Sequence, residues 1–172
     1  MSLIPPATTS GSDTVRVFVS YSHKDSFWKD MLLPLFRFPG VDVKPWSDTE
    51  IQAGQNWDQK IHDALKEMDV FAALISVHFA VSKYIDEQEC RIAEERHKND
   101  EIEVLPIYLG APSDGDCEWL MKFQRVPGEK SWSEMRAAFP DYDHALKPIR
   151  DGIKAVVERA RQRKAAKRPR KR

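Results

Sequence analysis

Apolar residues occur along this chain in two patterns, short dense runs and recurrences every three or four residues. Dense runs bounded by polar residues are typical of strands, and the longer spacing is typical of helices. The run at 70–76 is apolar on both faces, as a central parallel strand requires, whereas Pro45 places the second run at an end or an edge of the sheet. We expect strands at 15–21, 41–46, 70–76 and 104–110, with a fifth, edge strand at 123–126.

Helical spacings separate these runs. We expect helices at 27–35, 61–68 and 84–98, a short helix at 118–122, and a last helix from about Ala145 into the basic end of the chain. Pro34 should kink the first helix or close its last turn. Because strand and helix alternate, the crossovers should be right-handed and should cover both faces of a parallel sheet. The predicted fold class is α/β, a flavodoxin-like three-layer sandwich with a five-stranded parallel sheet and helices on both faces.

A length of 172 residues suits one domain with tails. Residues 1–14 are rich in Pro, Ser, Thr and Gly and predict a disordered lead; the domain should occupy 15–160, and a basic tail 161–172. Residues 159–172 contain nine Lys or Arg and no acid, so 18 basic and 27 acidic residues remain in the body. That balance argues against nucleic-acid binding by the folded part, and the basic end is expected to be a solvated helix end or a linker.

The sequence lacks the signals that usually mark several classes of protein. The two cysteines make no disulfide framework, no apolar run is long enough to span a membrane, and the first thirty residues show no export signal, so a cytoplasmic protein is expected. Dehydrogenase, NTPase, serine-hydrolase and metalloprotease motifs are missing, and the histidines and cysteines have no metal-binding spacing. We expect neither a metal nor a cofactor. A response regulator would carry an acidic pair where the first strand ends in SYSHKD.

In an open parallel sheet, ligands bind beyond the carboxyl ends of the strands. That rule brings together three stretches that are distant in sequence, namely 21–25, 46–55 and 76–82. We therefore expect the functional site at the edge of the sheet where these loops meet.

Four ordered stretches resemble the TIR (Toll/interleukin-1 receptor) domain family, in particular its bacterial branch. FVSYSHKDSFW is similar to the first strand and its turn, WSDTEIQAGQNWDQKIHDAL to the BB loop and second helix, LISVHFAVSKYIDEQE to the third strand and helix, and VLPIYLG to the fourth strand. The resemblance covers about residues 15–160 and implies the five-stranded sheet. It also implies one of two activities: pairing between TIR domains, or cleavage of the nicotinamide–ribose bond of NAD⁺ with an essential Glu on the third helix.

Helical geometry selects a carboxylate without the family. On a regular helix Glu89 lies about 40° from Ile85, within the apolar face, whereas Glu87 lies about 200° around and Glu95 about 280°. The resemblance also selects Glu89 and leaves Glu87 as an alternative. Nicotinamide leaves as a neutral molecule from a cationic substrate, so no general acid is required. One fixed carboxylate near the ribose would stabilise the oxocarbenium-like transition state.

Residues beside the predicted site are candidates for binding the substrate. Trp46 and Tyr84 are candidate stacking faces for adenine or nicotinamide, although core packing is the simpler explanation for both. Polar side chains at strand ends could hold phosphate or ribose, or could simply cap the next helix; these are Ser20, Tyr21, Ser22, His23 and Ser76.

The BB loop is expected to serve assembly. Asp48 and Glu50 should shape or charge this loop, Gly54 should supply a backbone angle that other residues resist, and Trp57 follows at the start of the second helix.

The resemblance therefore implies an NAD⁺ nucleosidase, a hydrolase or cyclase that yields nicotinamide and ADP-ribose or a cyclic ADP-ribose-type signal in bacterial defence. Its expected partners are NAD⁺, further copies of itself through TIR–TIR contacts, and other domains or proteins of a defence system, with no membrane. The alternative is a noncatalytic TIR–TIR interaction or adaptor module, which would have no need of an inward Glu89.

Overall fold

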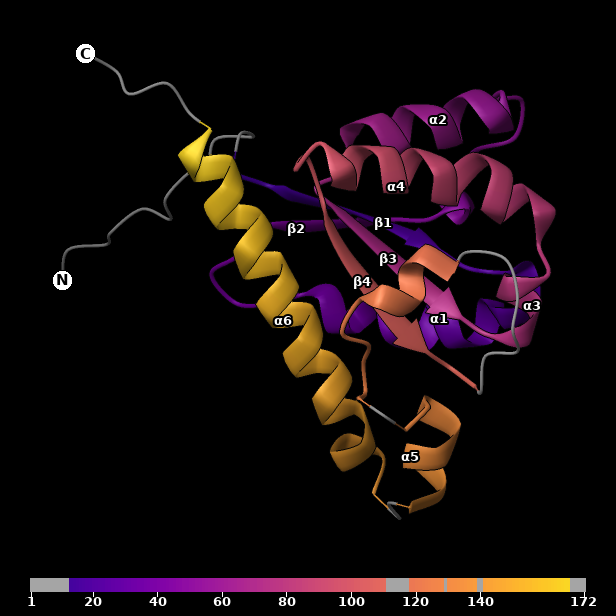
Figure 1. The fold of residues 1–172 in the computed structure, drawn as a ribbon, viewed down its shortest axis with the longest axis vertical. Coiled ribbons are helices and arrows are strands. Elements are labelled where there is room, and N and C mark those ends of the chain that lie inside the picture. The colour runs from indigo at the N-terminus through magenta and orange to yellow at the C-terminus, as the bar shows by residue number, and fades with distance from the viewer. Residues whose placement is uncertain (1–12, 111–117, 129, 139–140, 168–172) are drawn as a thin grey trace, which may run out of the picture.

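The computed structural model describes residues 13–110, 118–128, 130–138 and 141–167. Four parallel strands form one sheet in the order β2-β1-β3-β4, with helices on both of its faces (Figure 1). The strands are β1 (Val15–Ser20), β2 (Val43–Trp46), β3 (Val70–Ile75) and β4 (Glu103–Tyr108). The α/β class, the central position of β3 and the edge position of β2 are confirmed.

The sheet has four strands, so the expected fifth strand at 123–126 is wrong. Only Val126 pairs with β4, through an isolated parallel bridge to Ile107. Its N–H donates to the Pro106 carbonyl at 3.0 Å, and its carbonyl accepts from the Tyr108 N–H at 2.9 Å. Toward residue 124 the next donor of β4 would be the N–H of residue 106, which proline lacks, so the ladder gains no bond from it in that direction.

The helices enclose the sheet in two layers. They are α1 (Ser26–Leu32), α2 (Trp57–Glu67), the short α3 (Val77–Ala80), α4 (Arg91–Lys98), α5 (Trp132–Ala138) and α6 (Tyr142–Ala166). Figure 1 shows α2 and α4 over one face and α1 and α6 over the other. Among the described residues, no helix is long and apolar enough to cross a membrane.

Alternation along the strands divides the core between these layers. In β1, Val17 and Val19 face the cluster formed with α1 and α6, whereas Phe18 faces the cluster formed with α2 and α4. All six residues of β3 are buried because both of its faces are covered. The period-two geometry of a strand thus builds both halves of the core from the same few residues.

Two of the predicted helices differ in detail from regular α-helices. The first ends at Leu32 and tightens into a 3₁₀ turn, Leu33–Phe36, in which Pro34 occupies the first turn. The helix expected at 84–98 begins instead with a π-helical segment, Ile85–Cys90, before α4. The helix expected at 118–122 is a 3₁₀ helix, Glu118–Lys122.

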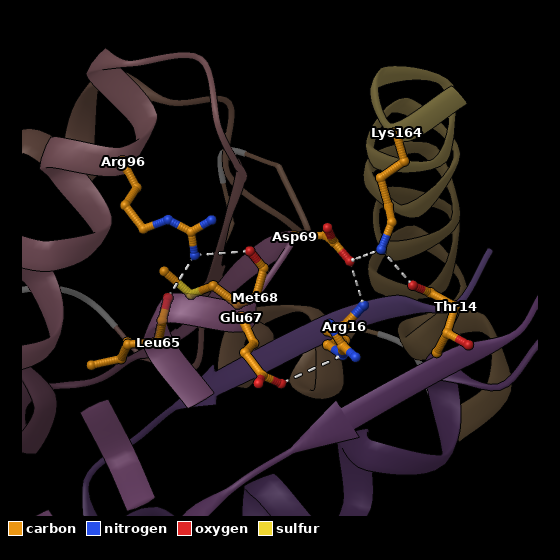
Figure 2. Close-up of polar contacts among 8 residues, drawn as sticks. All are labelled: Thr14, Arg16, Leu65, Glu67, Met68, Asp69, Arg96 and Lys164. Atoms are coloured by element: carbon orange, nitrogen blue, oxygen red, sulfur yellow. Dashed lines mark hydrogen bonds and ion pairs between the residues drawn. The ribbon is translucent and has the colours of Figure 1, made fainter. Parts of the chain in front are cut away.

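The end of α6 is fastened to the amino edge of the sheet (Figure 2). Lys164 Nζ donates to the Asp69 carboxylate and to the Thr14 carbonyl, both at 2.8 Å, and Asp69 also accepts the Arg16 N–H at 2.8 Å. Nearby, Arg159 Nε donates to Glu103 at 3.1 Å. The basic run is therefore a docked helix as far as residue 166; residues 168–172 of the expected tail and 1–12 of the expected lead lie outside the described residues.

Candidate active site

A pocket of about 300 Å³ opens at the carboxyl edge of the sheet. It lies where the loops after β1 and β2 meet the segment after α3, as the topology predicts. Its lining includes Phe18, Tyr21, Ser22, His23, Lys24, Trp46, Asp48, Trp57, Ile61, Ser82, Tyr84, Ile85 and Glu89. A larger groove of about 790 Å³ runs along α6, but no residue of the carboxyl-edge loops lines it.

Glu89 is the buried carboxylate of this pocket. The residue is 7% exposed, and the Ser20 hydroxyl donates a hydrogen bond to its Oε2. Burial raises the pKa of Glu89 to about 8, although the Ser20 hydrogen bond lowers it, and the negative charge of Asp48 adds to the rise. The Glu89 carboxyl group therefore keeps its proton to a higher pH than an ordinary glutamic acid, and a cation beside it would favour the ionised form.

The expected orientation of the acidic residues is confirmed. Glu89 faces inward, while Glu87 and Glu95 are exposed. Glu89 belongs to the π-helical segment, in which hydrogen bonds run from i to i+5 and the turn is wider than in an α-helix. Residues four apart still share a face there, so Glu89 lies beside the buried Ile85.

Asp48 connects the BB loop to the first loop. Its Oδ1 accepts the Tyr21 hydroxyl at 2.5 Å, and its Oδ2 lies 2.5 Å from His23 Nε2. The side chain of Asp48 is only 15% exposed. Burial, then the hydrogen bond and charge of Asp48, move the pKa of Tyr21 well above its usual value, so this phenol stays neutral and donates. Asp48 was expected to shape the loop; it also lines the pocket.

Aromatic rings form the walls. Trp46 stacks on Phe18 with ring centroids 5.1 Å apart, so one face of its ring packs against the core. Tyr84 contacts Trp57 at 4.7 Å between ring centroids, and its hydroxyl donates to Asp58 at 3.0 Å. Because Trp57 is 40% exposed, this pair stands at the rim of the pocket rather than in the core.

Other predicted residues lie apart from the lining. Ser76 caps α3 by accepting the N–H groups of His78 and Phe79, and its hydroxyl donates to the buried Asp25 at 2.5 Å. This is the capping role that serves a polar residue after a strand. Glu50 and Gly54 are exposed on the BB loop, and Gly54 has the expected positive φ of 84°.

Sequence reasoning missed Phe18, Lys24 and Ile61 as lining residues. Phe18 and Ile61 have the pattern of ordinary core positions, and both do belong to the core cluster that floors the pocket. The bond between Asp58 and Tyr84 joins residues 26 apart and leaves no local signal.

Known proteins resemble this chain over most of its length. Residues 17–147 match the family model described as TIR domain. An uncharacterised protein of Sinorhizobium fredii (strain NBRC 101917 / NGR234), y4lF, is 31% identical over an alignment of 150 residues. The alignment covers 83% of this chain and 44% of the relative. The chain thus spans less than half of that relative's length. The TIR domains of the activated Roq1 resistosome recognising the effector XopQ align over 84% of each chain, with 20% identity and a TM-score of 0.37.

Proposed function

We propose that this chain, which belongs to the TIR domain family, cleaves the nicotinamide–ribose bond of NAD⁺. Glu89 is the catalytic carboxylate in this proposal. The observation that carries the proposal is the burial of Glu89 in a pocket with aromatic walls. An acidic side chain is costly to bury, and a scaffold surface gains nothing from that cost.

The raised pKa suits a cationic substrate. The nicotinamide ring of NAD⁺ carries a positive charge, and the charge moves toward the ribose as the bond breaks. A cation beside Glu89 offsets the cost of its ionisation, so substrate binding itself would convert the resting carboxyl to the carboxylate. The carboxylate then stabilises the oxocarbenium-like transition state in a site shielded from water.

The size of the pocket favours one placement of NAD⁺. About 300 Å³ is at the lower end for ligand pockets and suits the nicotinamide riboside half. The adenosine half would extend across the rim, where Trp57 and Tyr84 present aromatic rings. The hydroxyl of Ser22 and the His23 imidazole, from the loop after β1, would meet the ribose or phosphates between the two halves.

The direct test is incubation of the purified chain with NAD⁺, followed by chromatographic separation of products. Nicotinamide should appear together with ADP-ribose or a cyclic isomer, in amounts that match the NAD⁺ consumed. Intact NAD⁺ at high protein concentration, under conditions that favour self-association, would defeat the proposal.

Several exposed apolar side chains favour a second role in TIR–TIR association. Trp57, Val77 and Val81 are 40%, 49% and 66% exposed. Such residues are typical of protein interfaces. We propose that these surfaces and the BB loop, with Glu50 and Gly54, assemble copies of the chain in the cytoplasm and switch the enzyme on within a bacterial defence pathway. The same surfaces would serve an adaptor if NAD⁺ cleavage is absent.

A further inference from the structure

We infer that His23, oriented by Asp48, is the general base that activates the water attacking the ribosyl carbon. This inference rests on the proposed NAD⁺ cleavage and adds a second catalytic residue to it. The loop after β1 would then govern what attacks the ribosyl carbon, and not the breaking of the bond to nicotinamide. Asp48 acts through His23 and is a positioning residue.

The geometry of the pair determines which ring nitrogen is available. His23 Nε2 lies 2.5 Å from Asp48 Oδ2, and because a carboxylate only accepts hydrogen bonds, Nε2 carries the hydrogen. In the neutral imidazole Nδ1 then has a free lone pair, and within the part of the chain that the structure describes it makes no hydrogen bond. The second oxygen of Asp48 accepts the Tyr21 hydroxyl, so the carboxylate cannot swing away from the ring. A base held in one tautomer by a carboxylate is the arrangement that general-base catalysis uses.

His23 and Glu89 line the same pocket but differ in their access to water. The side chain of His23 is 73% exposed, whereas Glu89 is 7% exposed. Glu89 is therefore suited to meeting the developing cation in the closed end, and His23 to meeting water that enters from the mouth.

The C1′–N bond breaks and its electron pair leaves with neutral nicotinamide. Water oxygen bonds to C1′ while Nδ1 of His23 takes one water proton, which gives ADP-ribose and an imidazolium that returns its proton to solvent. An acceptor that has no proton to lose, such as a pyridine, needs no base for the same attack.

That difference supplies the test. The parent chain and the variants His23→Gln and Asp48→Asn are incubated with NAD⁺ and 3-acetylpyridine, and ADP-ribose and the exchanged dinucleotide are both quantified. The Gln amide can keep the hydrogen bond to Asp48 but is no base, so the ratio of hydrolysis to exchange should fall by about 10²-fold, as expected for loss of a general base. Asp48→Asn should lower the same ratio, because its amide no longer fixes the tautomer.

The matched control is His144→Gln. His144 also pairs with an aspartate, Asp141 at 2.7 Å, but it lies at the start of α6 and does not line the pocket. It should leave the ratio unchanged. If the parent chain cleaves NAD⁺ and His23→Gln lowers both products equally, the inference is overturned and the proposed function is not. His23 would then have only a structural role. A parent chain that forms neither product would remove the proposed function and the inference together.

Discussion

The amino and carboxyl edges of the sheet both carry an Asp and a Glu, but the partners of these acidic residues differ. At the amino edge, Asp69 accepts a hydrogen bond from Lys164 of α6 (Figure 2). Glu103 accepts one from Arg159 of the same helix. At the carboxyl edge, Asp48 and Glu89 are met by hydroxyl groups and a histidine. No Lys or Arg among the described residues forms an ion pair with either of them.

The neighbours decide what each carboxylate can do. A carboxylate bound to cations stays ionised and adds stability, so its charge is already committed. A carboxylate whose partners are neutral donors keeps unused capacity to attract a cation, and in the buried Glu89 this appears as a pKa raised to about 8. At the amino edge the acidic residues are paired with cations, as is typical of a structural region. At the carboxyl edge they are not, as is typical of a candidate functional site.

The largest expected effect separates Glu89 from its exposed neighbour. Glu89→Gln should slow nicotinamide release by about 10²- to 10³-fold, the usual loss when one preorganised electrostatic group is removed. Its thermal stability should hold or rise, since a buried ionisable group is lost. Glu87→Gln, two residues along on the exposed side, is the control and should matter little. Equal rates for Glu89→Gln and the parent would end the catalytic assignment.

The next effect is the pH dependence of kcat/KM in the parent chain. The free enzyme needs ionised Glu89, so kcat/KM should rise by about tenfold per pH unit below its pKa and level off near pH 8. The negative charge of Asp48 adds to the raised pKa of Glu89. The nearby hydroxyls of Tyr21 and Tyr84 stay neutral because their pKa values lie above the usual value. A profile flat from pH 5 to 9 would contradict the assignment.

The same shift has an opposite consequence for stability. Because the folded pKa lies above the ordinary value of 4.5, the folded state holds its proton more tightly, and stability should fall as pH rises from about 4.5 to about 8. Glu89→Gln should lack this component of the fall, which thermal melts across that pH range would show.

A smaller effect tests the amino edge. Lys164→Ala removes a partly buried donor to Asp69 and to the Thr14 carbonyl, and should lower the free energy of unfolding by about 1–2 kcal/mol, measured by denaturant titration. Turnover per folded molecule should not change. Arg161→Ala is the control, because its pair with Glu158 is exposed and 3.6 Å long. If both variants are equally stable, the docked end of α6 contributes no more than a surface ion pair.

The smallest expected effect comes from shortening the chain. Removal of residues 165–172 keeps the contacts of Arg159 and Lys164, and also the ion pair between Arg163 and Glu103. NAD⁺ turnover should therefore stay within a few-fold of the parent. A cut before Arg159 removes all these contacts and should lower the thermal midpoint clearly. If the shorter deletion abolished turnover while the chain stayed folded, the basic tail itself would be a functional element.

Local patterns determined much of this protein. Dense apolar runs located all four strands, Pro45 indicated the edge position of β2, and helical spacing placed Glu89 on the inner face. These features depend on short-range periodicity, which a single sequence displays directly. The resemblance to TIR domains added the proposed chemistry, and that chemistry remains a prediction.

Only the tertiary structure decided the rest. The segment 123–126 pairs with β4 only at Val126, and Pro106, on a strand twenty residues earlier, offers no donor for a further bond toward residue 124. Asp48 became part of the pocket because the crossover after β1 brings β2 beside it, which sets Tyr21 and His23 against that carboxylate. The basic end became a docked helix because the starts of β3 and β4 present Asp69 and Glu103 to it. Each outcome depends on contacts between residues far apart in the chain, which periodicity cannot encode.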